Sequence, residues 1–305
     1  MNCDSAFARA EIHLAEESET FRTPLIDIAT RTIADIHIGT FELNSARTTR
    51  LTPSMREDSD QADPHPAGDD QGEAMASATQ CTGADFCEEI SGAIDTAFNR
   101  FYDGDPPSRR VYATENFELL ADMSPLTAGH LLLLPKKHYL SFAQVLTAHP
   151  GETEDLVDNI VEIYAETFRQ PLVMEHGSGP GQEDHACITH AHLHLLPVDG
   201  NAVDDLLLRD GLAYQDLNSI SELAQDPWPG SSYFLRLFNG RCRVYLPTAQ
   251  QKRQYLRSVA GAVLSIEDPE WDYAVVMRKD DLRSTMRMVE HWSDRLSYVR
   301  PDPGA

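Results

Sequence analysis

The sequence predicts an α+β fold in which an antiparallel sheet packs against helices. Segments of strand character lie on both sides of one amphipathic segment, residues 153–168, instead of alternating regularly with helices. An Asn239-Gly240 pair between two apolar segments predicts a hairpin with a two-residue turn. Residues 51–83 combine Pro, Gly, Ser, Asp and Gln with few large apolar side chains, which is typical of a disordered linker.

The first strands are expected soon after this linker. Residues 110–113 and 117–121 have strand character and surround a polar turn at residues 114–116. The continuous apolar run at residues 131–134 is stopped by Pro135 and is typical of a strand buried on both faces.

One helix and two further strands are expected next. Residues 153–168 place apolar side chains at helical spacing, and we expect this stripe to pack on the core. A strand starts at residues 171–174 and is broken by the glycine-rich segment 177–181. Residues 188–198 are predicted to form the following strand.

The last part of the chain contains the predicted hairpin. Its arms are residues 233–237 and 243–246. Two amphipathic helices are expected after it, near residues 250–264 and 280–293.

The acidic composition limits the partners of this protein. Its 305 residues carry a formal net charge of -24, with 49 acidic and 25 basic side chains, which disfavours nonspecific binding to nucleic acid or an anionic membrane. No apolar run approaches the roughly 18 residues that cross a bilayer, and the first residues carry acids where a secretory signal is basic and apolar. The five cysteines are irregularly spaced, so free thiols and a cytoplasmic location are expected.

Histidines are concentrated in one part of the chain. Eight of the 12 histidines lie within the 65 residues from 130 to 194. Side chains alternate between the faces of a strand, so a strand at residues 188–198 would place three imidazoles on one face, each about 6.6 Å from the next. These are His190, His192 and His194. The opposite face would be an apolar seal of Ala191, Leu193 and Leu195.

Three interpretations of these histidines compete. Three adjacent imidazoles are a costly way to fill a core, so a purely structural cluster is disfavoured. Alternate histidines on a strand can converge on zinc. An imidazole can also attack phosphorus, become covalently linked and release the product to water, which divides one difficult displacement into two easier ones. The strand alone leaves zinc binding and nucleophilic catalysis open.

The surrounding motifs favour nucleophilic catalysis. The segment from His190 to Leu196 reads His-Ala-His-Leu-His-Leu-Leu. It is preceded by Asp122-Met123-Ser124-Pro125, Gly129-His130 and Pro135-Lys136-Lys137-His138. From about Asp85 to Val198, this arrangement resembles the histidine triad (HIT) family of nucleotide hydrolases and transferases. The resemblance implies a HIT-like antiparallel sheet packed with helices, here followed by a C-terminal α/β extension.

The resemblance assigns roles to four histidines. It implies that His192 is the nucleophile and that the intermediate is a nucleotidylated imidazole, a phosphohistidine. His190 and His194 are expected to orient this nucleophile and to hydrogen-bond the phosphate oxygens or the leaving group. His130 is expected to support the array from the neighbouring strand. Phosphoryl transfer needs positioning and charge stabilisation, which a row of donors on a rigid sheet supplies.

The resemblance also implies a nucleotide-binding set. Asp122 is expected to hold the ribose hydroxyls, and the glycine-rich turn to cradle the phosphates through backbone N–H groups. Many members carry Gln-Ser or Gln-Thr just before the triad, where this chain has Ala186-Cys187. A phosphate contact would then fall to Cys187 or Thr189. The complete expected set is Asp122, Ser124, Gly181, Gln182, Cys187 and Thr189.

No cofactor is expected to be required for this reaction. Some bacterial members hold zinc through a Cys-x-x-Cys motif, the histidine of Pro-Lys-x-His and the first triad histidine. Here Ala84 replaces one cysteine, and Cys81 lies too far upstream for the usual spacing. Zinc at Cys87, His138 and His190 is therefore less favoured than a free Cys87 and an ordinary His138.

The domain organisation follows from the linker and from the extent of the resemblance. We expect an N-terminal extension of unknown role at residues 1–50, the linker at 51–83, the HIT domain at 84–200 and a C-terminal extension at 201–305 that packs on it. Family members often dimerise through sheet and helix, and the extension is an alternative cover for that surface. If it closes over the triad, Arg257 is expected to contact the leaving group.

These observations predict a nucleotide hydrolase. It would cleave a nucleoside phosphate ester, anhydride or phosphoramidate at the α-phosphate through nucleotidyl-His192. A nucleotidyltransferase that passes the group to phosphate or a small metabolite is an alternative, because both reactions share the first step. A non-catalytic nucleotide-binding protein is a second alternative, which the intact triad disfavours. The expected partner is a purine nucleotide, and a homodimer stays open.

Overall fold

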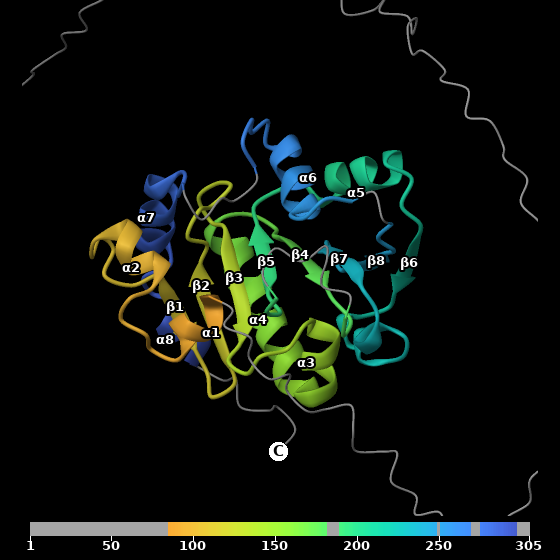
Figure 1. Cartoon of the computed structure of the whole chain (residues 1–305), viewed down its shortest axis with the longest axis horizontal. Helices are drawn as coiled ribbons and strands as arrows, with labels where there is room; N and C mark the ends of the chain where they lie inside the picture. The colour runs from red at the N-terminus through yellow and green to blue at the C-terminus, as the bar shows by residue number, and fades with distance from the viewer. Residues whose placement is uncertain (1–84, 182–188, 249–250, 270–274, 298–305) are drawn as a thin grey trace, which may run out of the picture. The chain divides into compact units, whose positions relative to one another are not determined.

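Eight strands form one sheet in the described part of the chain, in the order β1-β2-β3-β5-β4-β7-β8-β6 (Figure 1). Every pair of neighbours is antiparallel, so the fold is of the predicted α+β class. The computed structural model describes residues 85–181, 189–248, 251–269 and 275–297. The expected N-terminal extension and linker lie outside these residues. No helix in the described ranges has both the length and the apolar character that a bilayer crossing requires.

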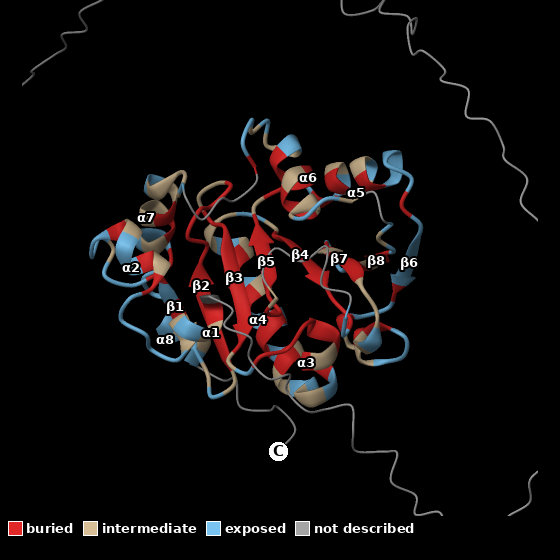
Figure 2. Ribbon diagram, viewed as in Figure 1, coloured by how far each residue is buried: buried red, intermediate tan, exposed pale blue. Residues whose placement is uncertain are grey.

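The first strands have the bounds that the sequence predicts. β1 (Arg110–Ala113) and β2 (Phe117–Ala121) surround the expected turn, and β3 (Leu131–Pro135) follows them. β4 (Leu172–Gly177) ends where the glycine-rich segment begins. β2, β3 and β4 are buried along their whole length, as the continuous apolar runs indicate (Figure 2).

The histidine strand is shorter than predicted. β5 (Leu193–Leu196) starts after His192, so the predicted strand at residues 188–198 is wrong in its first half. His194 lies on the strand and pairs with Leu132 of β3 and Met174 of β4. His190 and His192 precede the strand. Their side chains therefore need not follow the alternation between the two faces of the sheet that a paired strand imposes.

The predicted hairpin extends the same sheet. β7 (Tyr233–Phe238) and β8 (Arg241–Tyr245) are joined by Asn239 and Gly240, whose φ angles of 51° and 71° are those that a tight hairpin turn needs. β6 (Tyr214–Leu217) completes the sheet beside β8. Because β7 pairs with β4, the C-terminal part of the chain itself covers the edge of β4.

One face of the sheet carries most of the helices. Leu131, Leu133, Leu193 and Leu195 point into the larger core cluster, together with Ala191, which confirms the apolar seal behind the triad. Helices whose side chains join this cluster are α2 (Ala97–Tyr102), α3 (Phe142–Ala148), α4 (Pro150–Thr167), α7 (Lys279–Met288) and α8 (Trp292–Ser297). The helix expected near residues 280–293 is thus divided into α7 and α8. Short 3-10 turns at Ile220–Ala224 and Trp228–Gly230 lie between β6 and β7.

The opposite face carries the triad between two groups of helices. α1 (Asp85–Ile90) packs Phe86 against Leu132 in one small cluster. α5 (Gly200–Arg209) and α6 (Tyr255–Val263) pack with Met174 in another. His194 pairs with both Leu132 and Met174, so it lies on this face between α1 and α6.

Candidate active site

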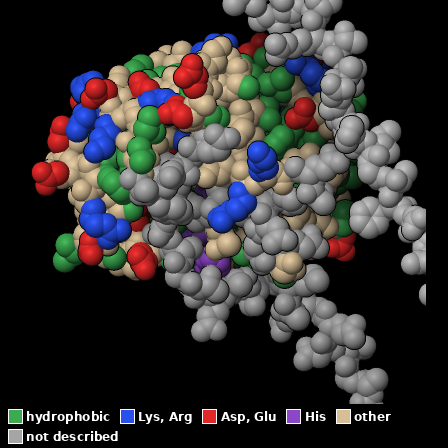
Figure 3. Space-filling model, turned by 45° about the horizontal axis from the view of Figure 1, so that its top comes forward, with side chains coloured by type: hydrophobic (Ala, Val, Ile, Leu, Met, Phe, Trp, Pro, Cys, Tyr) green, Lys and Arg blue, Asp and Glu red, His purple; other side chains and the backbone are tan. Residues whose placement is uncertain are grey.

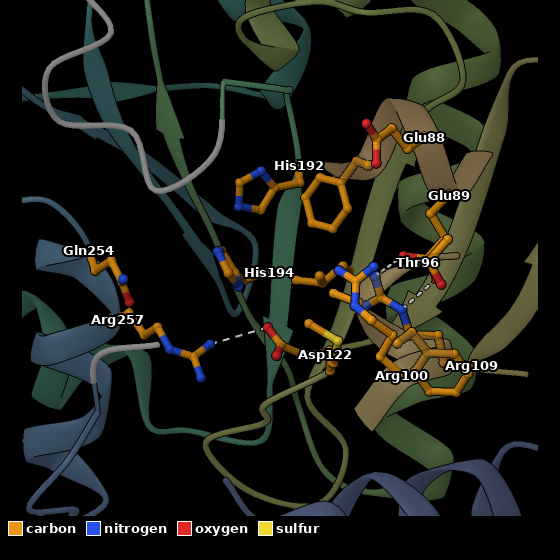
Figure 4. A pocket seen from close by; sticks show the side chains of 15 residues that line it. Glu88, Glu89, Thr96, Arg100, Arg109, Asp122, His192, His194, Gln254 and Arg257 are labelled. Carbon is orange, nitrogen blue, oxygen red and sulfur yellow. Dashed lines mark hydrogen bonds and ion pairs between the residues drawn. The ribbon is translucent and has the colours of Figure 1, made fainter. Parts of the chain in front are cut away.

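The imidazole of His192 is held by its own backbone neighbourhood. The residue is 6% exposed, and its Nδ1 lies 2.7 Å from the carbonyl oxygen of His190. A carbonyl oxygen only accepts hydrogen bonds, so Nδ1 carries the proton and Nε2 keeps its lone pair. His192 lines the cavity on this face of the sheet (Figure 4). The lone pair of Nε2 is therefore available for a further interaction.

A chain of hydrogen bonds fixes the proton of His194. The backbone N–H of Leu126 donates to Nδ1 of His130 over 3.1 Å, so His130 carries its proton on Nε2. This Nε2 lies 2.9 Å from Nδ1 of His194 and donates to it. The neutral imidazole of His194 must then carry its proton on Nε2. His194 also lines the cavity, where it offers a donor beside the lone pair of His192.

Burial keeps these imidazoles neutral. It lowers the pKa of His130 to about 3 and that of His190 to about 4. Burial likewise lowers the pKa of His192 and of His194, and the positive charge of Arg257 adds to the effect on both. A neutral imidazole at pH 7 has the lone pair that attack on phosphorus requires.

Asp122 directly follows β2 and lines the same cavity. Its Oδ1 accepts the backbone N–H of Ser124 over 2.8 Å, and its Oδ2 lies 3.1 Å from Nη1 of Arg257 and 3.5 Å from Nε2 of His130. Burial acts to raise the pKa of Asp122, but His130, Arg257 and the Ser124 N–H outweigh it, and the pKa falls to about 2. The carboxylate is thus ionised at neutral pH.

The cavity has an apolar wall and a polar end. Figure 4 shows His192, His194, Asp122 and Arg257 among the lining side chains, with Glu88 and Glu89 farther to the right. Its apolar lining consists of Phe86, Ala97, Phe98, Met123 and Leu132. Flat aromatic and aliphatic surface beside a few convergent polar groups suits a nucleotide, whose base is apolar on its faces.

Histidine reaches the surface of this face in a small patch. In the space-filling view it lies in a recess with lysine or arginine side chains nearby, although acidic side chains are spread over the same face (Figure 3).

The side chain of His190 points away from the other two triad members. Its Nδ1 lies 3.3 Å from Sγ of Cys87, and its Nε2 donates to the carbonyl oxygen of Pro135 over 2.8 Å. Nδ1 of His138 lies 3.2 Å from the same sulfur. His190 was expected to orient His192 and to hydrogen-bond the phosphate oxygens or the leaving group; its backbone carbonyl holds His192, and its imidazole is not among the described residues that line the cavity.

Cys87, His138 and His190 have the chemistry of a zinc site. Their donor atoms all lie within 4.8 Å of one another. The bond from His190 Nε2 to Pro135 leaves Nδ1 as a lone-pair donor, an arrangement that metal-bound histidines use. These three residues would hold the ion. Asp122, His130 and His194 meet the same spacing, but Arg257 places a positive charge against them.

The other expected nucleotide ligands are more dispersed. The hydroxyl of Ser124 accepts the backbone N–H of Met277 over 3.0 Å, which joins the C-terminal part to the loop after β2. Gly181 is exposed with a φ of 75°, and Thr189 is half-buried next to His190. Gln182 and Cys187 lie outside the described residues.

Several lining residues were not singled out from the sequence. Arg109 is buried and donates to both carboxylate oxygens of Glu89, and nothing in the local sequence pairs these two residues. Phe98 and Tyr102 show the helical spacing that indicates α2, but that spacing does not reveal a cavity wall. Arg257, which is expected to contact the leaving group if the extension closes over the triad, forms an ion pair with Asp122.

Comparisons with known proteins match part of the chain. The family model described as "Scavenger mRNA decapping enzyme C-term binding" matches residues 95–203. The chain is 26% identical over 105 residues to Protein hit of Bacillus subtilis, which covers 34% of this chain and 72% of that protein. It is 26% identical over 106 residues to adenylylsulfatase HINT3 of Arabidopsis thaliana, covering 34% of this chain and 52% of that protein. A solved HIT-like protein of Bartonella henselae is 21% identical with a TM-score of 0.31, covering 39% of this chain and 79% of that chain.

Proposed function

Because the chain is a member of the histidine triad (HIT) family, we propose that it is a nucleotide hydrolase that cleaves its substrate at the α-phosphate through a nucleotidyl-His192 intermediate. One observation carries this proposal. The His190 carbonyl holds the Nδ1 proton of His192, so that the lone pair of Nε2 is available at the cavity. A buried, neutral imidazole with a fixed tautomer is a prepared nucleophile.

The reaction divides into two displacements. In the first, Nε2 of His192 attacks the α-phosphorus, a P–N bond forms, and the bond from phosphorus to the leaving group breaks. The leaving group takes up the Nε2 proton of His194. In the second, water attacks the same phosphorus and gives its proton to His194. The P–N bond then breaks and releases a nucleoside monophosphate with neutral His192. No step requires a metal ion.

The acceptor that attacks in the second step decides between hydrolysis and transfer. An acceptor hydroxyl or inorganic phosphate in place of water would make the enzyme a nucleotidyltransferase. The name of one relative, adenylylsulfatase, supports hydrolysis and an adenylyl group. We therefore propose a purine nucleotide, with an adenylyl group first, as the substrate.

A product analysis tests this proposal. Adenosine 5′-phosphomorpholidate, adenosine 5′-phosphosulfate and diadenosine triphosphate would each be incubated in ¹⁸O-water with and without inorganic phosphate, and the products weighed by mass spectrometry. We expect AMP with one ¹⁸O atom from at least one substrate. ADP formed from the phosphomorpholidate or the phosphosulfate in the phosphate arm alone would show transfer instead, because diadenosine triphosphate releases ADP as its leaving group in both arms.

Two variants make the test specific to His192. His192→Asn removes the nucleophile and is expected to lower the rate by a factor of about 10³ or more. His291→Asn is the matched control, because the side chain of His291 is 81% exposed. A His192→Asn protein with the wild-type rate would contradict the mechanism.

A further inference from the structure

Arg257 reaches the cavity from the C-terminal part of the chain. It lies on α6, far from the triad in sequence, and is only 3% exposed. Its Nε donates to the Pro269 carbonyl oxygen over 2.7 Å, its Nη1 to the Asp122 carboxylate over 3.1 Å, and its Nη2 to the Ser124 carbonyl oxygen. A planar guanidinium that is held from three directions is preorganised for a ligand.

The charge of Arg257 acts at the reacting imidazoles. Burial is the main cause of the lowered pKa of His192 and of His194, and Arg257 lowers both further. All three side chains line the same cavity, and in Figure 4 Arg257 lies to the left of His192 and His194. A buried cation that lines the same cavity also attracts the oxygens of a phosphate that approaches Nε2 of His192.

The other described arginines of the cavity serve different partners. Arg109 donates to both carboxylate oxygens of Glu89 and to the carbonyl oxygen of Ala121. Arg100 is exposed and pairs with the equally exposed Asp95. Neither forms a described hydrogen bond with Asp122 or Ser124, as Arg257 does.

Arg257 keeps capacity for a ligand. A guanidinium has two N–H groups on each Nη atom, and the bonds to Asp122 and Ser124 use one on each. Each Nη atom thus keeps a second N–H group, and such groups are the donors with which arginine binds phosphate oxygens. The ion pair with Asp122 balances the charge of Arg257 before a nucleotide binds.

We propose that Arg257 is the residue that binds the substrate phosphate, so that the C-terminal part of the chain completes the nucleotide site. In a protein with a net charge of -24, an anionic substrate needs such a local cation. The inference rests on the proposed function in that a nucleotide must occupy the cavity, but it concerns phosphate binding and not the attack by His192.

Two probes that differ only in the phosphate test this role. Binding of AMP and of adenosine to the full chain would be measured by isothermal titration calorimetry. Arg257→Gln is expected to weaken AMP binding roughly 10- to 100-fold and to change adenosine binding no more than about twofold. Arg257→Lys keeps the charge but not the planar pair of donors, and is expected to restore part of the AMP affinity.

Arg243→Gln is the matched control. Arg243 also lies in the C-terminal part and forms an ion pair, with Asp216 at 2.6 Å, but it does not line the cavity. It is expected to leave both affinities unchanged. If Arg257→Gln does not fold, the Arg257→Lys protein is used for the test. Its affinity for AMP must then fall while its affinity for adenosine stays unchanged.

The outcomes separate this inference from the proposed function. Equal weakening of AMP and adenosine by the Arg257 variants, or no weakening of AMP, would overturn the phosphate-binding role. Wild-type protein that prefers AMP through Arg257 but forms no adduct at His192 would support the inference and contradict the proposed function. Wild-type protein that forms the adduct but binds AMP and adenosine equally would support the proposed function and contradict the phosphate-binding role of Arg257.

Discussion

The carbonyl oxygen of His190 accepts a hydrogen bond from the Nδ1–H of His192, with 2.7 Å between oxygen and nitrogen. The first triad histidine therefore orients the second through its backbone. The imidazole of His190 meanwhile lies beside Cys87 and His138. Two histidines that are adjacent in the motif therefore serve two separate groups of residues. This division gives each group its own testable consequences.

His130 is expected to control the rate and not the binding of substrate. His130→Ala removes the donor to Nδ1 of His194, and the Nε2 proton of His194 is then no longer fixed toward the cavity. We expect kcat to fall about 10- to 100-fold and KM to change about twofold or less. His149→Ala is the control, because His149 lies at the start of α4 and outside the cavity lining. Steady-state kinetics with an unchanged kcat for His130→Ala would rule out this support.

The free energy of unfolding is expected to decrease as the pH falls below about 6.5. Burial lowers the pKa of His130 to about 3 and that of His190 to about 4, while the unfolded chain binds these protons near pH 6.5. The unfolded state therefore binds more protons between these values, and stability is complete above pH 6.5. Urea unfolding at pH 7.5 and pH 5 should show a loss of about 2 kcal/mol for each such histidine. His130→Asn should lose less between these two pH values than the wild type does, and an equal loss would refute the assignment.

Asp122 is expected to recognise the sugar hydroxyls. Its two carboxylate oxygens accept from Ser124 and Arg257 and keep further lone pairs for a ribose. Wild-type protein should therefore bind adenosine about tenfold more tightly than 2′,3′-dideoxyadenosine, and Asp122→Asn should remove most of this difference. Calorimetric titration with both nucleosides measures it. A preference that survives in Asp122→Asn would assign the ribose to other residues.

Chelation of metal ions is expected to leave catalysis intact. The reaction proceeds through His192 and His194, whereas the donors that suit zinc are Cys87, His138 and His190. Prolonged treatment with 1,10-phenanthroline should keep the hydrolysis rate within about twofold. Elemental analysis of wild-type and Cys87→Ser protein, purified in parallel, reports whether zinc is held at these residues. Activity that is lost on chelation and restored by zinc would show that the metal takes part in the reaction.

Local patterns in the sequence account for much of the fold. The turn between β1 and β2, the apolar run of β3 and the Asn239-Gly240 hairpin are each encoded within a few neighbouring residues. The histidine strand was predicted too long because alternation describes a segment only while it is paired. At His192 a local bond to the His190 carbonyl replaces that pairing.

The parts of the site that the sequence did not reveal are long-range contacts. Arg257 and Asp122 form an ion pair across 135 positions of the chain, and Arg109 pairs with Glu89 across a helix and two turns. The spacing of apolar residues in the sequence does not show which helix packs against which loop. The pairing of β7 with β4 brings the C-terminal part of the chain, which includes Arg257, close to the triad.

The central claim is that Nε2 of His192 forms a covalent bond to the α-phosphorus. Rapid mixing with excess adenosine 5′-phosphomorpholidate, quenching in base and peptide mass spectrometry test it directly, because a phosphorus–nitrogen bond to histidine survives base. The mechanism predicts that the peptide containing His192 gains the mass of one adenylyl group in the wild type and not in His192→Asn. AMP production by wild-type enzyme without any such adduct, or an adduct on another residue, would contradict the claim.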